Sequence, residues 1–238
     1  MNYRFIQNLQ IDWDKIDYYS YLRKIPALQF EETLTFDKNI TFFVGENGTG
    51  KSTLLEAIAV AYGFNPEGGS KNYNFSTYDS HSELHNAIRL AKGVYKPKWS
   101  YFLRAESFYN VATKEEEYSD WAHPSQRYHE KSHGESFLAL AQHSFRSKGL
   151  YLLDEPEAAL SPQRQLTLMI EMHKLAQKGA QFIVASHSPI LLGIPDAQIL
   201  SFDDGVIHEC EYIDTDSYQV TEMFINNREY LLKRLLNE

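Results

Sequence analysis

The segment Gly45-Glu46-Asn47-Gly48-Thr49-Gly50-Lys51-Ser52 constrains the fold of this chain more than any other stretch of the sequence. Its spacing, G-x-x-x-x-G-K-[ST], requires a strand before it and a helix after it. The apolar run Ile40 to Val44 predicts that strand. Apolar residues at helical spacing between Ser52 and Tyr62 predict the helix, which Gly63 ends. With both flanks in place, the segment is predicted to be a phosphate-binding loop rather than an incidental glycine turn.

The residue types in this loop explain how it would hold phosphate groups. Its glycines let successive backbone N–H groups curl around the phosphates, and the helix N-terminus adds positive potential. Lys51 would reach the β- and γ-phosphate oxygens, where it also serves catalysis, and Ser52 would ligate Mg²⁺. The predicted nucleotide contacts are Gly45, Glu46, Asn47, Gly48, Thr49, Gly50, Lys51, Ser52 and Thr53.

A second chemical signal follows the apolar segment Leu150 to Leu153, where the chain continues with Asp154 and Glu155. If that segment is a strand of the same sheet, both carboxylates lie at the sheet edge where ligands bind. Asp154 is predicted to hold the metal, and Glu155 is predicted to orient and deprotonate the attacking water. Two carboxylates at a strand end are more often structural, but the phosphate loop upstream favours the catalytic interpretation.

The remaining sequence alternates strand-like and helix-like segments. Such alternation predicts an α/β fold with a largely parallel sheet covered on both faces. Further strands are expected at Leu34 to Val44 with a turn at 37–39, Trp99 to Arg104, Gln181 to Ala185, and a hairpin of Gln198 to Phe202 with Val206 to Glu211. Helices are expected at Ser82 to Lys92, Glu135 to Ser147, Pro162 to Lys178 and Tyr218 to Leu236. Asn65 to Tyr78 is expected to be a loop, and Phe108 to Lys131 is ambiguous.

Together these motifs resemble the ABC-type ATPase superfamily, over roughly Phe36 to Ser201. Pro156 to Ser161 is similar to the family's D-loop, which contacts a partner subunit. His187 follows a predicted strand in the place of the switch histidine that senses the γ-phosphate. A lone histidine there is more often structural, but its place in this order of motifs favours a catalytic role.

The family's signature motif and glutamine loop are altered in this chain. Lys131-Ser132-His133-Gly134-Glu135 occupies the place of the signature. Ser132, Gly134 and Glu135 are therefore expected to contact the nucleotide held by the opposite subunit. Where the family has its loop glutamine, this chain has Glu106, which is a candidate metal ligand and equally a plain surface residue. An aromatic partner for adenine is expected among Tyr18, Tyr19 and Tyr21, unless these are core residues.

The resemblance implies a single ABC-type ATPase domain over residues 1–238, with antiparallel N-terminal strands and a small helical insertion or subdomain at roughly 64–148. It also implies ATP and Mg²⁺ as ligands, ATP hydrolysis, and a nucleotide-dependent head-to-tail homodimer. The altered signature and the absence of sustained heptads between Lys51 and Asp154 favour a stand-alone ATPase similar to those of DNA maintenance and defence. Its macromolecular partner, protein or nucleic acid, is unidentified.

Composition limits the remaining possibilities. The formal net charge of −9 opposes non-specific adhesion to nucleic acid or anionic lipid. No apolar run of about 18 residues occurs, so direct membrane insertion is not expected, and the chain is expected to be cytoplasmic. Two alternatives stay open: the ATP-binding subunit of a transporter, and a slow nucleotide-gated signalling module.

Overall fold

The computed structural model describes residues 4–70, 82–104 and 133–236. Its main feature is a seven-stranded sheet with the order β10-β9-β3-β8-β7-β6-β4. The four inner pairings, from β9 to β6, are parallel, and the pairings at the two edges are antiparallel. The predicted α/β class with a largely parallel sheet is therefore confirmed. Its strands are β3 (Ile40–Val44), β4 (Gly69–Ser70), β6 (Trp99–Arg104), β7 (Gly149–Asp154), β8 (Gln181–Ala185), β9 (Gln198–Ser201) and β10 (His208–Glu209).

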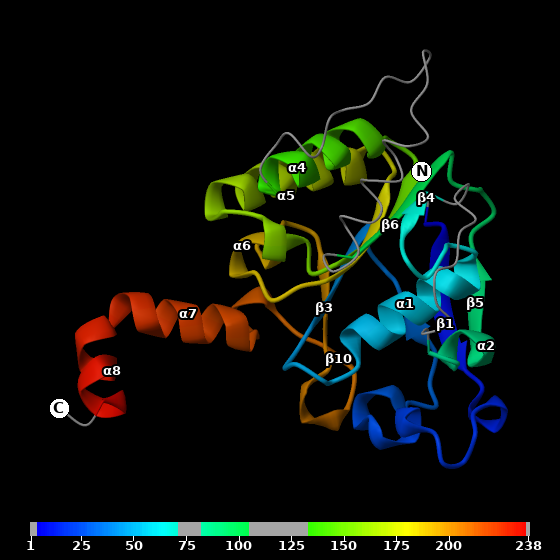
Figure 1. The fold of residues 1–238 in the computed structure, drawn as a ribbon, viewed down its shortest axis with the longest axis horizontal. Helices are drawn as coiled ribbons and strands as arrows, with labels where there is room; N and C mark the ends of the chain where they lie inside the picture. Colours follow the sequence, from blue (N-terminus) through cyan, green and yellow to red (C-terminus); the bar gives the residue numbers. More distant parts are fainter. Residues whose placement is uncertain (1–3, 71–81, 105–132, 237–238) are drawn as a thin grey trace.

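Helices cover both faces of this sheet (Figure 1). Every residue of β3, β7 and β8 is buried, as expected of parallel strands covered on both sides. Successive side chains of β7 alternate between two hydrophobic cores: Leu150 and Leu152 face α1, and Tyr151 and Leu153 face α4 and α5. The helices are α1 (Lys51–Tyr62), α2 (Leu84–Ala87), α4 (His133–Ser144), α5 (Pro162–Gln177), α6 (Pro189–Leu192), α7 (Asp216–Asn226) and α8 (Arg228–Leu235).

A second, three-stranded antiparallel sheet with the order β2-β1-β5 packs beside α1. Its strands are β1 (Ile6–Ile11), β2 (Leu34–Thr35) and β5 (Ile88–Lys92). This arrangement confirms the expectation of antiparallel N-terminal strands. The residues of β1, Ile6–Ile11, were not individually predicted to form a strand.

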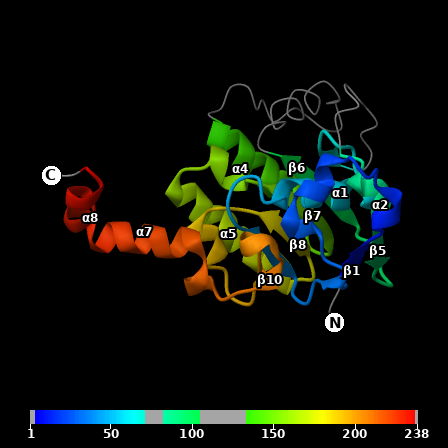
Figure 2. The same cartoon turned by 90° about the horizontal axis from the view of Figure 1, so that it is seen from below.

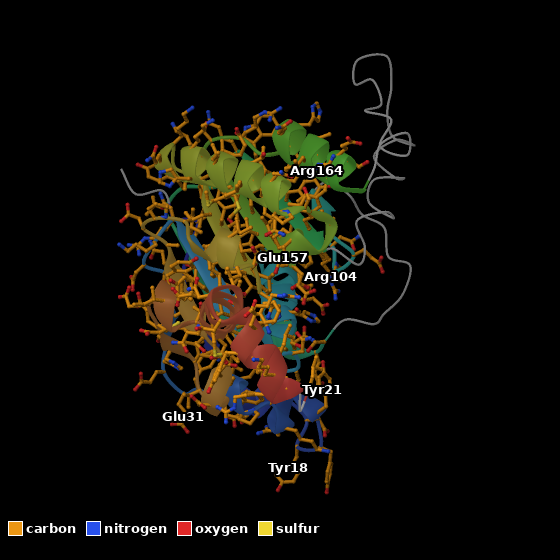
Figure 3. All side chains as sticks on the ribbon, turned by 90° about the vertical axis from the view of Figure 1, so that its left-hand side faces the viewer. Tyr18, Tyr21, Glu31, Arg104, Glu157 and Arg164 are labelled. Atoms are coloured by element: carbon orange, nitrogen blue, oxygen red, sulfur yellow. The ribbon has the colours of Figure 1, made fainter. Side chains whose placement is uncertain are left out.

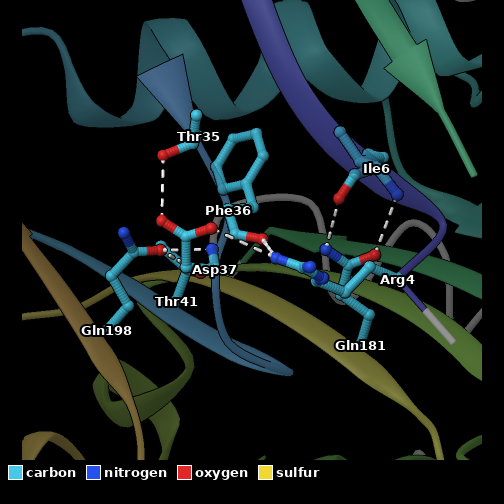
Figure 4. Close-up of polar contacts among 8 residues, drawn as sticks. All are labelled: Arg4, Ile6, Thr35, Phe36, Asp37, Thr41, Gln181 and Gln198. Carbon is cyan, nitrogen blue, oxygen red and sulfur yellow. Dashed lines mark hydrogen bonds and ion pairs between the residues drawn. The ribbon is translucent and has the colours of Figure 1, made fainter. Parts of the chain in front are cut away.

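Two buried glutamines fasten the N-terminal segment to the parallel sheet (Figure 4). The Oε1 atom of Gln181 accepts hydrogen bonds from the backbone N–H groups of Phe5 and Ile6, and its Nε2 donates to the Ile6 carbonyl at 2.8 Å. On β9, which lies on the other side of β3, the Oε1 atom of Gln198 accepts from the Asp37 N–H and the Thr41 hydroxyl. Because these amides are buried, leaving them without partners would cost about 1–3 kcal/mol each.

The predicted helix Ser82 to Lys92 is wrong in its second half. Only Leu84–Ala87 is helical, and Ile88–Lys92 forms β5, which pairs with β1 along its length. Ile88 is buried and Leu90 is partly buried, so alternate residues face the core as in a strand. Long-range pairing with β1 thus overrides the local helical pattern.

Two further boundaries differ from the predictions. The expected C-terminal helix Tyr218 to Leu236 is two helices, because Asn227 leaves the helical region with φ −130° and ψ 32°. Gly69–Ser70, inside the expected loop, pairs with β6 as β4. The helical subdomain at roughly 64–148 stays a prediction, since 71–81 and 105–132 lie outside the described residues. Within the described ranges, no helix combines the length and hydropathy needed to cross a membrane.

Candidate active site

The loop between β3 and α1 has the backbone geometry that its glycines permit. Gly45, Gly48 and Gly50 all have positive φ, at 134°, 85° and 102°. A Cβ atom on Gly50 would lie 2.8 Å from the Ile25 side chain and 3.2 Å from that of Leu28. The loop therefore rests closely on the N-terminal 3₁₀ segments, and glycine is required for both conformation and space at this position.

Asp203, in the turn between β9 and β10, supports this loop by a hydrogen bond. Its Oδ1 accepts a 2.9 Å hydrogen bond from the Glu46 N–H, and its Oδ2 accepts one from the Ser201 hydroxyl at 3.1 Å. A Cβ atom on Gly45 would lie 2.9 Å from the same Oδ1. Sequence reasoning had placed Asp203 only in a hairpin turn, since nothing in its local pattern indicates a contact with a loop so distant in sequence.

Lys51 lies within the loop that it follows. Its Nζ donates to the Gly45 carbonyl at 2.6 Å and to the Glu46 carbonyl at 2.7 Å, and the residue is 4% exposed. Burial lowers the pKa of this ammonium, while the nearby carboxylates Glu155, Asp203, Asp154 and Glu46 raise it. The carboxylates thus offset part of the cost of burying the positive charge.

Ser52 and Asp154 are joined although β7 and α1 are far apart in sequence. The Ser52 Oγ donates a 2.8 Å hydrogen bond to Asp154 Oδ1. Arg104 Nε lies 3.8 Å from Asp154 Oδ2, and Arg104 also pairs with Glu56 at 2.7 Å. A hydroxyl and a carboxylate side by side are the hard oxygen donors that Mg²⁺ prefers, so this pair fits that ion.

Among the described residues, no group of three or more His, Cys, Asp or Glu side chains could hold a metal. The Ser52 and Asp154 pair is therefore not a complete protein cage. Mg²⁺ commonly takes one or two protein ligands and completes its shell with water and substrate phosphates. The pair agrees with that mode of binding.

Glu155 adopts a backbone conformation that is unfavourable for its residue type. With φ 49° and ψ 51° it is left-handed, and its N–H donates to the Ala185 carbonyl at 2.9 Å. A non-glycine residue in this region costs on the order of 1–2 kcal/mol. The conformation is held by the pairing with β8 and by the 3₁₀ turn Pro156–Ala159 that follows. Such strain at the end of a sheet strand directs attention to Glu155 as a functional residue.

His187 and Glu157 meet beyond the end of β8. The His187 N–H donates to Glu157 Oε1 at 2.6 Å, while His187 Nε2 and Glu157 Oε2 are buried with no hydrogen-bond partner in the described part of the chain. Burial lowers the pKa of His187, with Lys51 adding to the effect, and burial raises the pKa of Glu157. Burial therefore favours the neutral form of both side chains. Glu157 had been assigned only to a D-loop by sequence.

A cavity of about 980 Å³ connects these groups with the C-terminal part of the chain. Its lining includes the loop residues Gly45 to Asn47, Glu155, His187 and residues of 203–220. The sequence-predicted loop, general base and switch histidine therefore share one cavity.

The signature segment is described only from its helical part. Gly134 is buried, and a Cβ atom on it would lie 2.7 Å from the Ala159 carbonyl, so α4 begins against the 3₁₀ turn after Glu155. Glu135 Oε1 pairs with Arg164 at 3.0 Å. Ser132 and Glu106 lie outside the described residues.

The candidate adenine partners are exposed rather than core residues. Tyr18, Tyr19 and Tyr21 are 78%, 87% and 56% exposed. Figure 3 shows Tyr18 projecting at the end of the molecule away from Arg164, while Glu157 and Arg104 lie between them. The core alternative for these tyrosines is wrong, and their contact with a base stays a prediction.

Comparison with known proteins agrees with this geometry. A family model described as "AAA domain" matches residues 21–139, half of the chain. The chain belongs to the AAA domain family. A second model, "AAA domain, putative AbiEii toxin, Type IV TA system", matches residues 135–193 of this AAA domain protein. The predicted P-loop ATPase domain is thereby confirmed.

One curated relative of this AAA domain chain is the "Retron Vc95 probable ATPase" of Vibrio cholerae serotype O1 biovar El Tor. It is 34% identical over 85 residues, which cover 35% of this chain and 16% of the relative. The aligned region thus spans a small part of that longer protein.

Solved structures resemble the fold only distantly. The SMC head domain from Thermotoga maritima is 15% identical with a TM-score of 0.49, covering 89% of this chain and 100% of the other. The cbiO1 protein from Clostridium perfringens, part of the ABC transporter complex cbiONQ, is 13% identical with a TM-score of 0.49, covering 99% and 100%. The family assignment rests on the family model instead.

Proposed function

We propose that this AAA domain chain binds ATP with Mg²⁺ and hydrolyses it to ADP and phosphate. The observation that carries the proposal is the meeting of the phosphate loop with the end of β7, where Ser52 donates to Asp154 and Glu155 follows directly. A phosphate loop alone accounts only for nucleotide binding. Together with the metal-ligand pair and the neighbouring Glu155 carboxylate, it supplies the groups that phosphoryl transfer to water requires.

Each residue has a role in this proposal. The backbone N–H groups of 45–53 hold the phosphates, and the Lys51 ammonium neutralises the β- and γ-oxygens. Ser52 and Asp154 hold Mg²⁺, which when bound neutralises the charge that develops on the phosphate oxygens. The Glu155 carboxylate accepts a proton from the attacking water as the bond from the γ-phosphorus to ADP breaks. His187 contacts the γ-phosphate. Glu106 is proposed as a further metal ligand in place of the loop glutamine.

The direct test of the binding step is Lys51→Ala. This substitution removes the cation while the backbone cradle remains, so tight binding of ATP should be lost. Titration of a fluorescent ATP analogue, together with phosphate release, measures both steps. Unchanged affinity and turnover would overturn the assignment of the loop.

We further propose that hydrolysis is coupled to a head-to-tail homodimer, in which the signature segment of a second copy completes each site. Ser132, Gly134 and Glu135 are the residues expected to reach across, and the position of Gly134 against the turn after Glu155 supports this, since α4 begins beside the catalytic end of β7. Ser132→Arg should leave nucleotide binding by one copy intact and block the ATP-dependent dimer. A normal ATP-induced increase in the mass of this variant, seen by size-exclusion chromatography, would refute the shared site.

The coupled process is proposed from the names of the relatives. A retron ATPase and a family model named for a toxin of a toxin–antitoxin system favour a macromolecular partner, protein or nucleic acid, in defence or DNA maintenance. Pull-down with a hydrolysis-blocked variant would identify that partner. A transporter subunit would instead be retained with membrane proteins, and a slow signalling module would dimerise with ATP but show almost no turnover.

A further inference from the structure

The last two helices, α7 and α8, form an arm that leaves the body of the molecule (Figures 1 and 2). We call residues 216–236 the C-terminal arm. Every residue from 219 to 230 is exposed, and neither helix has a buried residue. Among the described residues, the contacts of the arm with the body lie at its root. There Gln219 Nε2 donates to the Ile213 carbonyl, the Thr215 hydroxyl donates to the Tyr212 carbonyl, and the Tyr212 hydroxyl donates to the Pro189 carbonyl.

Such an arm is not expected to be stable by itself. Its helices have 11 and 8 residues, and isolated helices shorter than about 12–15 residues are marginal in water. They nevertheless expose large apolar side chains, with Val220, Met223 and Phe224 on one face of α7 at helical spacing. The exposed apolar residues of the arm are Val220, Met223, Phe224, Ile225, Tyr230, Leu235 and Leu236. A surface of this kind indicates that another molecule covers it.

The charges along the arm differ between its root and its tip. The root segment 203–222 has no Lys or Arg, and its acidic residues are Asp203, Asp204, Glu209, Glu211, Asp214, Asp216 and Glu222. The tip segment 223–236 has Arg228, Lys233 and Arg234 against the single acidic residue Glu229. The root is therefore negative and the tip positive, with the apolar face of α7 between them.

This order of charges is self-complementary. If two α7 helices pack antiparallel on their apolar faces, the start of each lies beside the end of the other, because α7 is about 16 Å long at 1.5 Å per residue. Asp214 and Asp216 of one copy then lie near Arg228 of the other, from which α8 with Lys233 continues. The helix dipoles also oppose, which is favourable. The contact is the same from both sides, as a two-fold interface requires.

We propose that the C-terminal arm binds the arm of a second copy of this chain and so forms a dimer that does not require nucleotide. In this dimer, α8 of each copy packs against the acidic root of the other copy. This interface is separate from the head-to-tail contact of the proposed ATPase cycle, because it uses neither the phosphate loop nor the signature segment. An anionic membrane is a poorer occupant, since the acidic root of the arm would be repelled by it.

Charge reversal tests the proposal without touching the apolar face. One variant, Arg228→Glu with Lys233→Glu, makes the tip negative. The second, Asp214→Lys with Asp216→Lys, puts positive charges at the two root positions that would face the partner's tip. Either variant alone places like charges opposite each other and should be a monomer. An equimolar mixture of the two restores opposite charges at both ends and should form a heterodimer. Masses are measured by sedimentation equilibrium across a dilution series, without nucleotide and with chelator.

The outcomes separate this interface from others. Wild type should be dimeric, each variant monomeric with unchanged helical circular dichroism, and the mixture dimeric. A monomeric wild type at every concentration, variants that keep the wild-type mass, or a mixture that stays monomeric would each overturn the proposal. Co-sedimentation of a monomeric wild type with phosphatidylserine vesicles would assign the arm to a lipid surface instead. The Lys51→Ala variant, whose arm is unchanged, should dimerise without nucleotide as the wild type does. The test of the arm therefore stands even if the proposed ATPase function fails.

Discussion

The Ser52 hydroxyl donates a 2.8 Å hydrogen bond to Asp154 across 102 residues of sequence, which joins the first turn of α1 to the end of β7. This contact brings the two oxygen donors of the proposed Mg²⁺ site together. Each is fixed by its own element, the serine by the helix that follows the loop and the aspartate by a fully buried strand.

The pair predicts a specific dependence on Mg²⁺. Ser52→Ala removes one ligand and a hydrogen bond to a charged group, which is worth about 1.5–3 kcal/mol. The Mg²⁺ concentration for half-maximal phosphate release should therefore rise by about tenfold or more. Ser147→Ala, at an exposed serine between α4 and β7, is the matched control and should leave the Mg²⁺ titration unchanged. Equal titration curves for Ser52→Ala and wild type would contradict the metal assignment.

The hydrogen bond from the phosphate loop to Asp203 gives a second prediction. Asp203→Ala removes the acceptor of the Glu46 N–H, so the loop should lose order and ATP affinity should fall by about tenfold, the equivalent of about 1.4 kcal/mol. Asp203→Asn keeps an acceptor oxygen and should retain most of the affinity. Isothermal titration with a non-hydrolysable ATP analogue compares the three proteins. If Asp203→Ala and Asp203→Asn lose the same ATP affinity, the loss comes from removing the negative charge of Asp203 and not from removing the hydrogen-bond acceptor of the Glu46 N–H.

The buried carboxyl of Glu157 predicts a pH dependence of stability. Its pKa is raised above 4.5 in the folded state, so its contribution is fully present below pH 4.5 and is lost as the pH rises through the raised pKa. Glu157→Gln keeps an acceptor for the His187 N–H and cannot ionise. Relative to wild type, its free energy of unfolding should therefore improve as the pH rises from 4.5 towards 8.

Urea unfolding of both proteins at several pH values checks this expectation. The lowered pKa of His187 has the opposite effect, because its penalty appears as the pH falls below 6.5, but it is present in both proteins and largely cancels in the difference. A stability difference that is constant with pH would contradict the assigned burial of the Glu157 charge.

Local patterns account for the parts of the site that could be predicted from the sequence. The phosphate loop, Glu155 and His187 follow strands that are buried throughout, and Asp154 ends one of them. The carboxyl ends of parallel strands meet at one edge of the sheet. Asp203 could not be found in this way, since its role depends on a contact with Glu46 that is 157 residues distant. Gln181 is a similar case, because its amide acts on β1 and not on its own strand.

The error at Ile88–Lys92 has a related cause. Ile88 and Leu90 suit either a helix or a strand over so short a segment, and only the pairing with β1 decides between them. The break at Asn227 likewise reflects backbone geometry that neither glycine nor proline signals.

The central claim is that Glu155 is the general base beside a metal held by Ser52 and Asp154, and Glu155→Gln tests it most directly. The amide keeps the shape and removes the basic carboxylate, so ATP should still bind while steady-state phosphate release falls by about 100-fold or more. Glu171→Gln, an exposed glutamate on α5, is the control and should leave turnover unchanged. The variant should also show an increase in mass with Mg–ATP in size-exclusion chromatography, relative to the same protein without nucleotide. Loss of hydrolysis without that increase would keep Glu155 as the base and argue against the head-to-tail cycle. The deciding measurement is phosphate release by Glu155→Gln at saturating ATP: a loss of about 100-fold with retained ATP affinity is predicted, and near-normal turnover would contradict the account.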